Sequence, residues 1–283
     1  MARERGLANV VLLAPSSFER VRSLARKHFG FDLERSKLAL VSRRIQQLRR
    51  ELGAHSAEEV VECYLQDPNE QVLAKLADYL STNHTFFHRE SEHFDEMQRR
   101  VLPELKGALA ARRDLRVWCA AASTGQEPYE LAMWIREILG PEIAQWKAGL
   151  LATDISSRAL TIARRAIYER PEVESLPSRL RHKYTKAIGT GQVQIVQSIR
   201  KDVVFRRLNL LEEGFPFRAR FHVIFCRNVM IYFDRSTRMD LIGRLIRWLE
   251  PGGYLFVGRA ESARGFESDL RFIQAGMYQK HLR

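Results

Sequence analysis

A turn of small residues, 120–125, stands between a short apolar run and a helix predicted to extend to about Leu139. Small side chains let a ligand approach the backbone, and Pro128 suits a first helical turn. Only Gly125 remains of the GxGxxG pattern of dinucleotide-binding proteins. Glu127 stands beside it, a carboxylate that would repel a pyrophosphate but could bind the ammonium of a methionine group. The turn therefore favours cationic S-adenosylmethionine over NAD.

Two further polar positions follow predicted strands. Asp154 closes the apolar run 149–153, where a carboxylate can accept hydrogen bonds from both hydroxyls of a ribose. The alternative is a cap on the helix predicted at 157–167, and we favour the nucleoside role. Asn209 and Leu210 form a polar and apolar pair able to bond to an adenine and cover it, although such a pair is unspecific by itself.

The elements that must position these residues are short apolar runs alternating with amphipathic helices. The runs are residues 115–119, 149–153, 203–207, 221–226 and 254–257. Such alternation predicts a mainly parallel sheet with helices on both faces, and such sheets bind ligands at the carboxyl ends of their strands. Residues 192–196 could pair with 203–207 as a hairpin, or 203–207 could be a core strand.

From residue 15 to about residue 80 the apolar spacing is helical throughout. Four helices are predicted: 18–29, 35–52, one that starts after Ser56, and 69–80. We expect Ser16 or Ser17 with Glu19 to cap the first helix and Gly30 to end it, and Ser56 with Glu59 to form a capping box. The polar and aromatic segment 81–90 then predicts a junction.

The chain has 283 residues and a formal net charge of +12. Residues 1–52 hold twelve Lys and Arg against five Asp and Glu, and Arg43, Arg44, Arg49 and Arg50 lie opposite the apolar stripe of the second helix. Such a surface could attract nucleic acid, acidic lipid or an acidic protein, or could simply be solvated.

No apolar run is long enough to cross a membrane, so we expect a cytoplasmic protein without membrane insertion.

Cysteine and histidine provide little further chemistry. Cys63, Cys119 and Cys226 are too far apart to suggest a disulfide framework or a zinc site. His84, His88 and His93 have mixed spacing, which favours polar junction residues over metal ligands. Cys226 could suggest the nucleophile of a cytosine methyltransferase, but it lacks the preceding proline. We expect no metal.

Several strings together resemble one family, the CheR-type chemotaxis-receptor methyltransferases, which methylate glutamate side chains on bacterial chemoreceptors. The strings are STN at 81–83 with Thr85, FHRE at 87–90, AASTGQEPY at 121–129, ATDIS at 152–156, NL at 209–210, FCRNVMIYF at 225–233 and PGGYLFVG at 251–258. The resemblance covers nearly the whole chain, and the string at 226–233 is the most specific.

The resemblance implies an α/β fold in two parts. Residues 1–80 would form an all-helical receptor-docking domain, and residues 81–94 a linker that contributes to the active site. Residues 95–283 would form a doubly wound, Rossmann-like class I S-adenosylmethionine-dependent methyltransferase domain. A small antiparallel β-subdomain would be inserted at about 168–202.

The resemblance also implies functional residues. Those expected to touch S-adenosylmethionine, or its product S-adenosylhomocysteine, are Asn83, Thr85, Arg89, Glu127, Asp154, Asn209, Leu210, Arg227 and Asn228. Arg89 and Tyr232 would face the reacting centre as catalytic residues. The basic second helix would dock on the acidic, glutamate-bearing cytoplasmic helices of a chemoreceptor, with Arg43, Arg44 and Arg50 as contacts. The protein would then work beside membrane-receptor arrays.

Four features depart from the family pattern. His88 replaces a second aromatic residue, Gln126 stands where a glutamate is common, and Arg259 and Ala260 replace a frequent His-Ser pair. Gln126 would lower the negative charge beside the sulfonium. The turn at 189–192 is shorter than in members that bind a receptor's C-terminal pentapeptide, so we expect recognition that does not depend on this tether.

A glutamate acceptor has an ordinary pKa near 4.3 and is already ionised at neutral pH, so no general base is required. The site must orient the carboxylate, and Arg89 could hold one oxygen and aim the other. Tyr232 could line the methyl path or simply pack.

Two other functions remain open, a nucleic-acid methyltransferase and a non-catalytic receptor-binding module that senses S-adenosylmethionine. The string after residue 225 lacks the Pro-Pro typical of amine-directed nucleic-acid enzymes.

Overall fold

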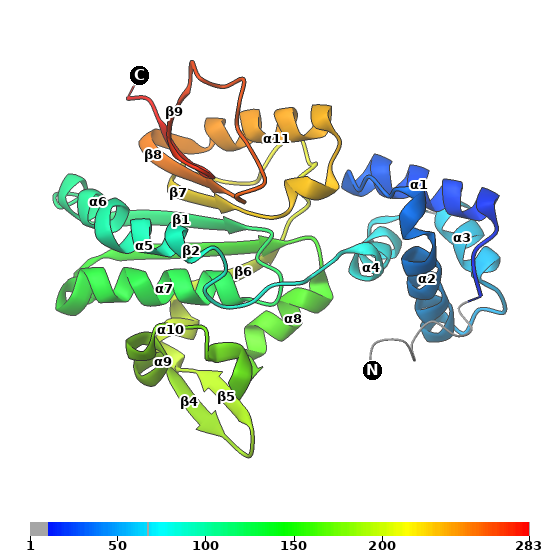
Figure 1. Ribbon diagram of the computed structural model, residues 1–283, viewed down its shortest axis with the longest axis horizontal. Helices are drawn as coiled ribbons and strands as arrows, with labels where there is room; N and C mark the ends of the chain where they lie inside the picture. The colour runs from blue at the N-terminus through cyan, green and yellow to red at the C-terminus, as the bar shows by residue number, and fades with distance from the viewer. Residues whose placement is uncertain (1–10, 67, 283) are drawn as a thin grey trace. The chain divides into compact units, whose positions relative to one another are not determined.

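The computed structural model describes residues 11–66 and 68–282, so Arg3 and Arg5, counted above in the N-terminal charge, lie outside the described residues. Contacts divide the chain into two units. The first holds the described residues up to Thr82 together with Tyr232–Asp234, and the second holds Asn83–Ile231 and the chain from Arg235 (Figure 1). The predicted fold class is confirmed: an all-helical unit accompanies a Rossmann-like unit that carries a small antiparallel sheet.

The helical unit contains the four predicted helices. They are α1 (Pro15–Phe29), α2 (Leu38–Leu52), α3 (Ala57–Gln66) and α4 (Glu70–Leu80), with a 3-10 turn, η1 (Arg35–Lys37), before α2. Apolar residues at helical spacing bury one stripe of each helix, among them Phe18, Val21, Val41, Ile45, Leu48, Val60, Tyr64, Leu76 and Leu80.

Most of the predicted helix ends are confirmed. Gly30 ends α1 with a φ of 71°, a left-handed conformation that glycine adopts easily. Ser56 Oγ accepts a hydrogen bond from the Glu59 N–H, while the Glu59 carboxylate reaches the N–H of His55. The predicted serine cap of α1 is wrong. This helix begins at Pro15, which needs no N–H partner in a first turn, and Ser17 lies inside the helix.

The main sheet has seven strands in the order β6-β2-β1-β7-β8-β10-β9. Their bounds are β1 (Asp114–Ala120), β2 (Lys147–Asp154), β6 (Val203–Arg207), β7 (Phe221–Cys226), β8 (Leu249–Val257), β9 (Leu270–Gln274) and β10 (Met277–Lys280). The first five in the order are parallel and are the five predicted runs, whereas β10 is antiparallel to both neighbours. The sequence did not predict β9 and β10, whose alternation is interrupted by polar residues.

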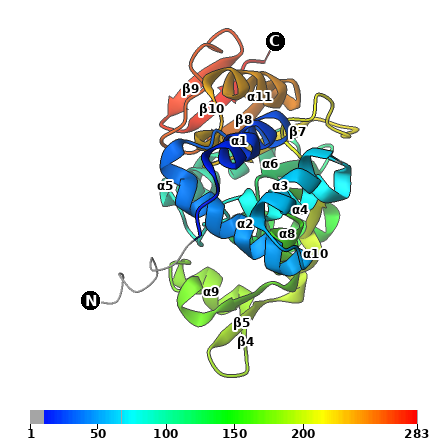
Figure 2. The same ribbon diagram turned by 90° about the vertical axis from the view of Figure 1, so that its right-hand side faces the viewer.

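The small sheet has the order β3-β5-β4 and is antiparallel. Its strands are β3 (Ile167–Glu169), β4 (Thr185–Ile188) and β5 (Gln192–Ile195). The hairpin proposed between 192–196 and 203–207 is therefore wrong, because β5 pairs with β3 and β4 while β6 pairs with β2. Figures 1 and 2 both show the β4–β5 hairpin extending away from the main sheet.

Helices surround the main sheet. They are α5 (Ser91–Glu96), a π-helical turn η2 (Met97–Val101), α6 (Leu102–Ala108), α7 (Gln126–Leu139), η3 (Gly140–Gln145), α8 (Ser157–Arg165), η4 (Arg170–Val173), α9 (Ser178–Tyr184), α10 (Gln197–Asp202), η5 (Met230–Tyr232) and α11 (Arg235–Arg247). Helix α8 ends two residues before the predicted residue 167, because Ala166 adopts a left-handed φ of 54°.

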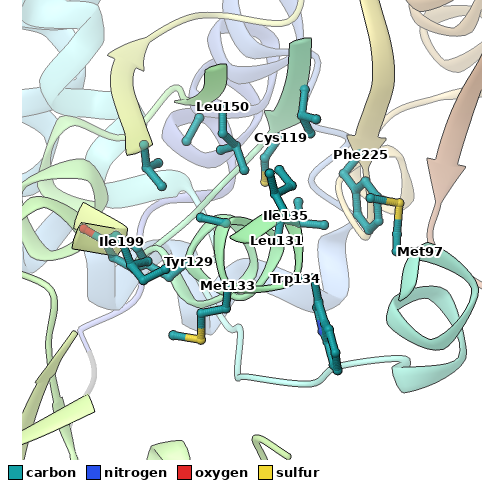
Figure 3. Packing of buried hydrophobic residues seen from close by; sticks show 14 of the residues in the cluster. Met97, Cys119, Tyr129, Leu131, Met133, Trp134, Ile135, Leu150, Ile199 and Phe225 are labelled. Carbon is teal, nitrogen blue, oxygen red and sulfur yellow. The ribbon is translucent and has the colours of Figure 1, made fainter. Parts of the chain in front are cut away.

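Helix α7 is the central helix of the core. Figure 3 shows its Leu131 and Ile135 directed toward Cys119 and Leu150 of the sheet, all of them in one cluster of buried apolar residues. Burying this helix against strands places its N-terminus beside the end of β1. Among the described residues, no helix is long and apolar enough to cross a membrane.

Candidate active site

The strand register places the predicted site residues at one edge of the sheet. Ala120 at the end of β1 pairs with Thr153 on one side and Cys226 on the other, and Asp154 pairs with Arg207. Because these strands are parallel, the loops that follow β1, β2, β6 and β7 all leave the sheet at this edge. The predicted cofactor residues from Glu127 to Asn228 lie at the end of β2, in those loops or in the first turn of α7.

The turn after β1 has an unusual backbone. Ala121, Ser123 and Gly125 have φ values of 58°, 50° and 98°. A Cβ atom on Gly125 would lie 2.9 Å from both the Ala163 Cβ and the Tyr168 hydroxyl oxygen, so only glycine fits there. The turn is therefore packed closely against α8 and β3.

Asp154 ties the turns after β1 and β2 together. Its carboxylate accepts hydrogen bonds of 2.8 Å from the backbone N–H of Ser123 and from that of Ser156. Asp154 is not the N-cap of α8, because Ser156 caps this helix by accepting a hydrogen bond from the Ala159 N–H. The buried Asp154 side chain thus shapes the site directly.

The segment from Asn83 to Glu90 is anchored along its backbone. Ser123 Oγ donates to the Asn83 carbonyl at 3.0 Å, and Ser175 Oγ donates to the Phe87 carbonyl at 2.8 Å. Arg227 donates to the Arg89 carbonyl. Three different elements therefore hold the predicted cofactor-binding segment against the sheet edge.

A buried cluster of charges lies under this segment. The Arg227 guanidinium, whose side chain is 1% exposed, donates to Glu127 at 2.8 Å and to Glu90 at 3.0 Å. It also lies over the rings of Phe94 and Phe225, with its central carbon 5.5 and 5.8 Å from their centroids. Arg227 was predicted to touch the cofactor, and the structure pairs its side chain with two carboxylates.

The two carboxylates differ electrostatically. Burial raises the pKa of Glu127, and Arg227 opposes this rise only in part. Burial also acts on Glu90, but its hydrogen bond from Asn228 and the charge of Arg227 together lower its pKa. One cation between two acids leaves one negative charge in excess when all three groups are ionised.

The two cysteines of the site are thiols. Burial raises the pKa of both Cys119 and Cys226 well above the ordinary value. Cys119 Sγ donates to Glu127 at 3.2 Å. A protonated, fully buried thiol is a poor nucleophile, so the geometry does not favour the cytosine-type chemistry considered for Cys226.

Glu261 is a site residue that the sequence did not reveal. This buried carboxylate accepts hydrogen bonds from the N–H groups of Gly258 at 2.6 Å, Asn228 at 2.9 Å and Ile231 at 3.1 Å. Asn228 has a left-handed φ of 57°. The carboxylate thus holds the loop after β7 in place. In the sequence, Glu261 is simply an acidic residue three positions after Gly258, and such a residue also fits an ordinary loop.

Arg89 differs from Arg227 in its surroundings. Its guanidinium donates to the His84 carbonyl at 3.1 Å and lies 5.7 Å from the centroid of the Phe86 ring. No carboxylate of the described residues forms an ion pair with it. The Arg89 guanidinium is therefore available to a carboxylate from outside.

The remaining cofactor candidates are also located. Asn209 Oδ1 accepts from the Leu211 N–H at 3.1 Å, which orders the loop after β6, and Leu210 is buried. Asn83 and Thr85 are half-buried. Among the described residues, no group of three His, Cys, Asp or Glu side chains could hold a metal ion.

Tyr232 belongs by its contacts to the helical unit. Its carbonyl accepts from the Asp32 N–H at 2.7 Å, and its ring meets that of Phe31 edge-on at 6.5 Å between centroids. On α2, Arg43 and Arg50 are exposed, whereas Arg44 donates to the Leu80 carbonyl at 2.7 Å. The Arg44 guanidinium thus already has a partner inside its own unit.

Two of the departures have local explanations. The buried Gln126 amide donates to Glu172 at 3.3 Å, and its oxygen accepts from Thr124. Arg259 forms an exposed ion pair of 2.8 Å with Glu92. Both polar groups are therefore engaged by neighbouring residues.

Comparison with known proteins gives a consistent result. Residues 83–279 match the model described as CheR methyltransferase, SAM binding domain, and residues 16–81 match the CheR methyltransferase all-alpha domain. The chain is 34% identical to a chemotaxis protein methyltransferase of Borreliella burgdorferi over 95% of both chains. It is 36% identical to chemotaxis protein methyltransferase 1 of Pseudomonas aeruginosa over 92% of this chain and 95% of that protein. It is 34% identical to the Escherichia coli chemotaxis protein methyltransferase over 88% of this chain and 85% of that protein.

Replacing Arg227 with Gln should destabilise the protein by about 3–5 kcal/mol near neutral pH, because two buried carboxylates lose their cation. The carboxyl groups of the variant would take up protons more easily, so the loss should shrink as the pH falls to about 5. Urea unfolding at both pH values measures the difference.

Arg259→Gln is the matched control, since it removes an exposed ion pair and should change stability by less than about 1 kcal/mol. An Arg227→Gln variant as stable as that control, or a loss that is the same at both pH values, would contradict this assignment.

Proposed function

Because the chain belongs to the CheR methyltransferase family, we propose that it methylates glutamate side chains on bacterial chemoreceptors. The donor is S-adenosylmethionine, and the products are S-adenosylhomocysteine and a glutamate methyl ester. The observation that supports the choice of acceptor is the Arg89 guanidinium, which no carboxylate of the described residues occupies. This cation is suited to receive an acidic side chain.

The charge cluster suits a cationic cofactor. Glu90, Glu127 and Arg227 together carry one excess negative charge when ionised, and they lie where the loops after β1 and β7 meet. The carboxylate of Glu127 would bind the ammonium group of the methionine portion. Asp154 would accept from the ribose hydroxyls, and Asn209 with Leu210 would hold the adenine. Asn83, Thr85 and Asn228 would complete the contacts.

The chemistry proposed for the protein is orientation. The bound sulfonium supplies an activated methyl group, and the glutamate acceptor is ionised at neutral pH, so the reaction calls for neither a general base nor a metal. The chain has to align the acceptor oxygen with the methyl carbon and exclude water, which can be worth about 7–11 kcal/mol. Arg89 would hold one acceptor oxygen and direct the other, because a planar guanidinium binds a carboxylate at two points.

Recognition of the receptor is proposed to involve the helical unit. Arg43 and Arg50 are exposed on α2. Both lie on the helix face opposite the buried Val41, Ile45 and Leu48. They would face acidic residues of the receptor's cytoplasmic helices, with the enzyme working at membrane-receptor arrays. The ring of Tyr232 lies near Lys37 and Phe31 of this unit, and its expected catalytic role stays a prediction.

Replacing Arg89 with Ala should lower kcat for receptor methylation about 100-fold, because the acceptor loses its guide. The Kd for S-adenosylhomocysteine, measured by calorimetry, should rise less than about fivefold. Arg99→Ala removes an arginine with a side chain 70% exposed and should leave both values unchanged. Unchanged turnover in Arg89→Ala would refute the role given to this residue.

Reversing the charge at Arg43 or Arg50 should lower kcat/KM for the receptor about tenfold at low salt, with kcat at saturating receptor preserved. The deficit should diminish in about 0.5 M salt, since exposed charges are screened. Arg264→Glu makes the same change in charge on the other unit and should have no effect. Equal losses in the three variants would show a nonspecific effect of net charge.

The turn between β4 and β5 contains only residues 189–191, and we propose that recognition does not use a receptor's C-terminal pentapeptide. A receptor fragment lacking its last five residues should be methylated at the rate of the intact fragment. Calorimetry with the free pentapeptide should show no heat of binding. Saturable binding of the pentapeptide would overturn this proposal.

A further inference from the structure

Glu130 of α7 is a fully buried carboxylate without a role in the mechanism above. Its Oε1 lies 2.7 Å from Nδ1 of His88, and its Oε2 accepts from the His88 backbone N–H at 2.7 Å. The Trp134 indole N–H also points to Oε1, at 3.4 Å. One buried carboxylate therefore holds both the ring and the backbone of His88.

The residue that it holds has a strained backbone. His88 has a φ of 60° and Glu90 a φ of 53°, a conformation that non-glycine residues rarely adopt. Arg89 stands between them. The carbonyls of Phe87 and Arg89 are held by Ser175 and Arg227, so the N–H of His88 supplies the anchor between those two. These anchors hold the backbone of residues 87–89.

We propose that Glu130 and His88 form a positioning pair that directs the Arg89 guanidinium toward the acceptor carboxylate. The inference deepens the proposed function and rests on it, because it assumes that Arg89 guides the acceptor. Asn83 has its own anchor in Ser123, so the cofactor contacts at the start of the segment should not depend on the pair.

The groups that face His88 favour its charged form. Glu130 faces it from α7, and Glu92 and Asp95 act on it from α5. The ring stacks on Phe94 at 5.9 Å between centroids and 25° between planes, and the Arg227 guanidinium lies over the same Phe94 ring. The hydrogen bond with Glu130 raises the pKa of His88 in spite of burial.

The sign of the pH dependence follows from this shift. A histidine whose pKa is raised in the folded protein stabilises it fully below the ordinary value of about 6.5 and loses that contribution as the pH rises through the raised value. Above it, His88 is neutral beside the buried Glu130. Turnover should therefore decline on the alkaline side.

The test uses the full chain and a receptor fragment, with kcat and the KM for S-adenosylmethionine measured from about pH 6 to about pH 9. Glu130→Gln keeps the shape but removes the negative charge. His88→Asn keeps a neutral donor and tolerates a left-handed backbone, but cannot be protonated. His182→Asn is the control, since this histidine is exposed and its Nδ1 lies 3.1 Å from the Ser178 hydroxyl oxygen.

The kcat of wild type and of the control should fall about threefold or more between about pH 6 and about pH 9. Both variants of the pair should have a kcat about tenfold lower at acid pH and nearly independent of pH, with the KM for S-adenosylmethionine changed less than about twofold. The imidazole shift of His88, followed by NMR, should titrate above the ordinary value in wild type and lower in Glu130→Gln.

Failure has two distinguishable forms. If wild type methylates the receptor and both variants of the pair follow its kcat and pH profile, the positioning role is wrong although the proposed function stands. If wild type forms no receptor ester at any pH, the proposed function fails and the role given to His88 fails with it. If one variant is unfolded, the other still decides the question, because each removes the charge pair from a different side.

Discussion

The buried ion cluster of Arg227 with Glu90 and Glu127 is the interaction on which the site depends. The three residues come from the loop after β7, the junction before α5 and the first turn of α7, so they join segments far apart in the sequence. A buried charge without a partner is strongly destabilising. The three segments can therefore pack together only when the Arg227 cation pairs with the carboxylates. When all three groups are ionised, one negative charge remains in excess, and under the proposed function a cationic ligand would bind there.

Internal carboxylates organise the loops around this cluster. Asp154 accepts two backbone N–H bonds from the turns after β1 and β2, Glu261 accepts three from the loops after β7 and β8, and Glu130 holds His88. Each carboxylate accepts hydrogen bonds from backbone N–H groups that lie outside the strands and so have no partner in a sheet. This explains how left-handed residues such as Ser123 and Asn228 persist at the sheet edge.

The sequence predicted the parts of the fold that follow from periodicity. Phe221–Cys226 is buried at every position and is apolar apart from His222, and the four N-terminal helices show clear apolar spacing. Parallel strands then bring Glu127, Asp154 and Asn228 to one edge without further information. Strands β9 and β10 lack such a pattern, and β4 and β5 have registers that only tertiary contacts determine.

The side-chain partners could not be predicted in the same way. Arg227 bonds to Glu127 a hundred positions away, and an arginine in a loop gives no sign of which carboxylate will meet it. Glu261 looks like an ordinary polar loop residue until its three N–H partners are seen. Arg44 resembles its exposed neighbour Arg43 in sequence, yet its guanidinium is bonded inside the helical unit.

The most direct test of the account is to incubate the protein with methyl-labelled S-adenosylmethionine and a chemoreceptor cytoplasmic fragment, and then to treat the labelled product with mild alkali. The account predicts label on receptor glutamates that alkali releases as methanol, because carboxylate esters hydrolyse readily. Label that survives alkali on an amine, or label on RNA supplied in place of the receptor, would contradict it.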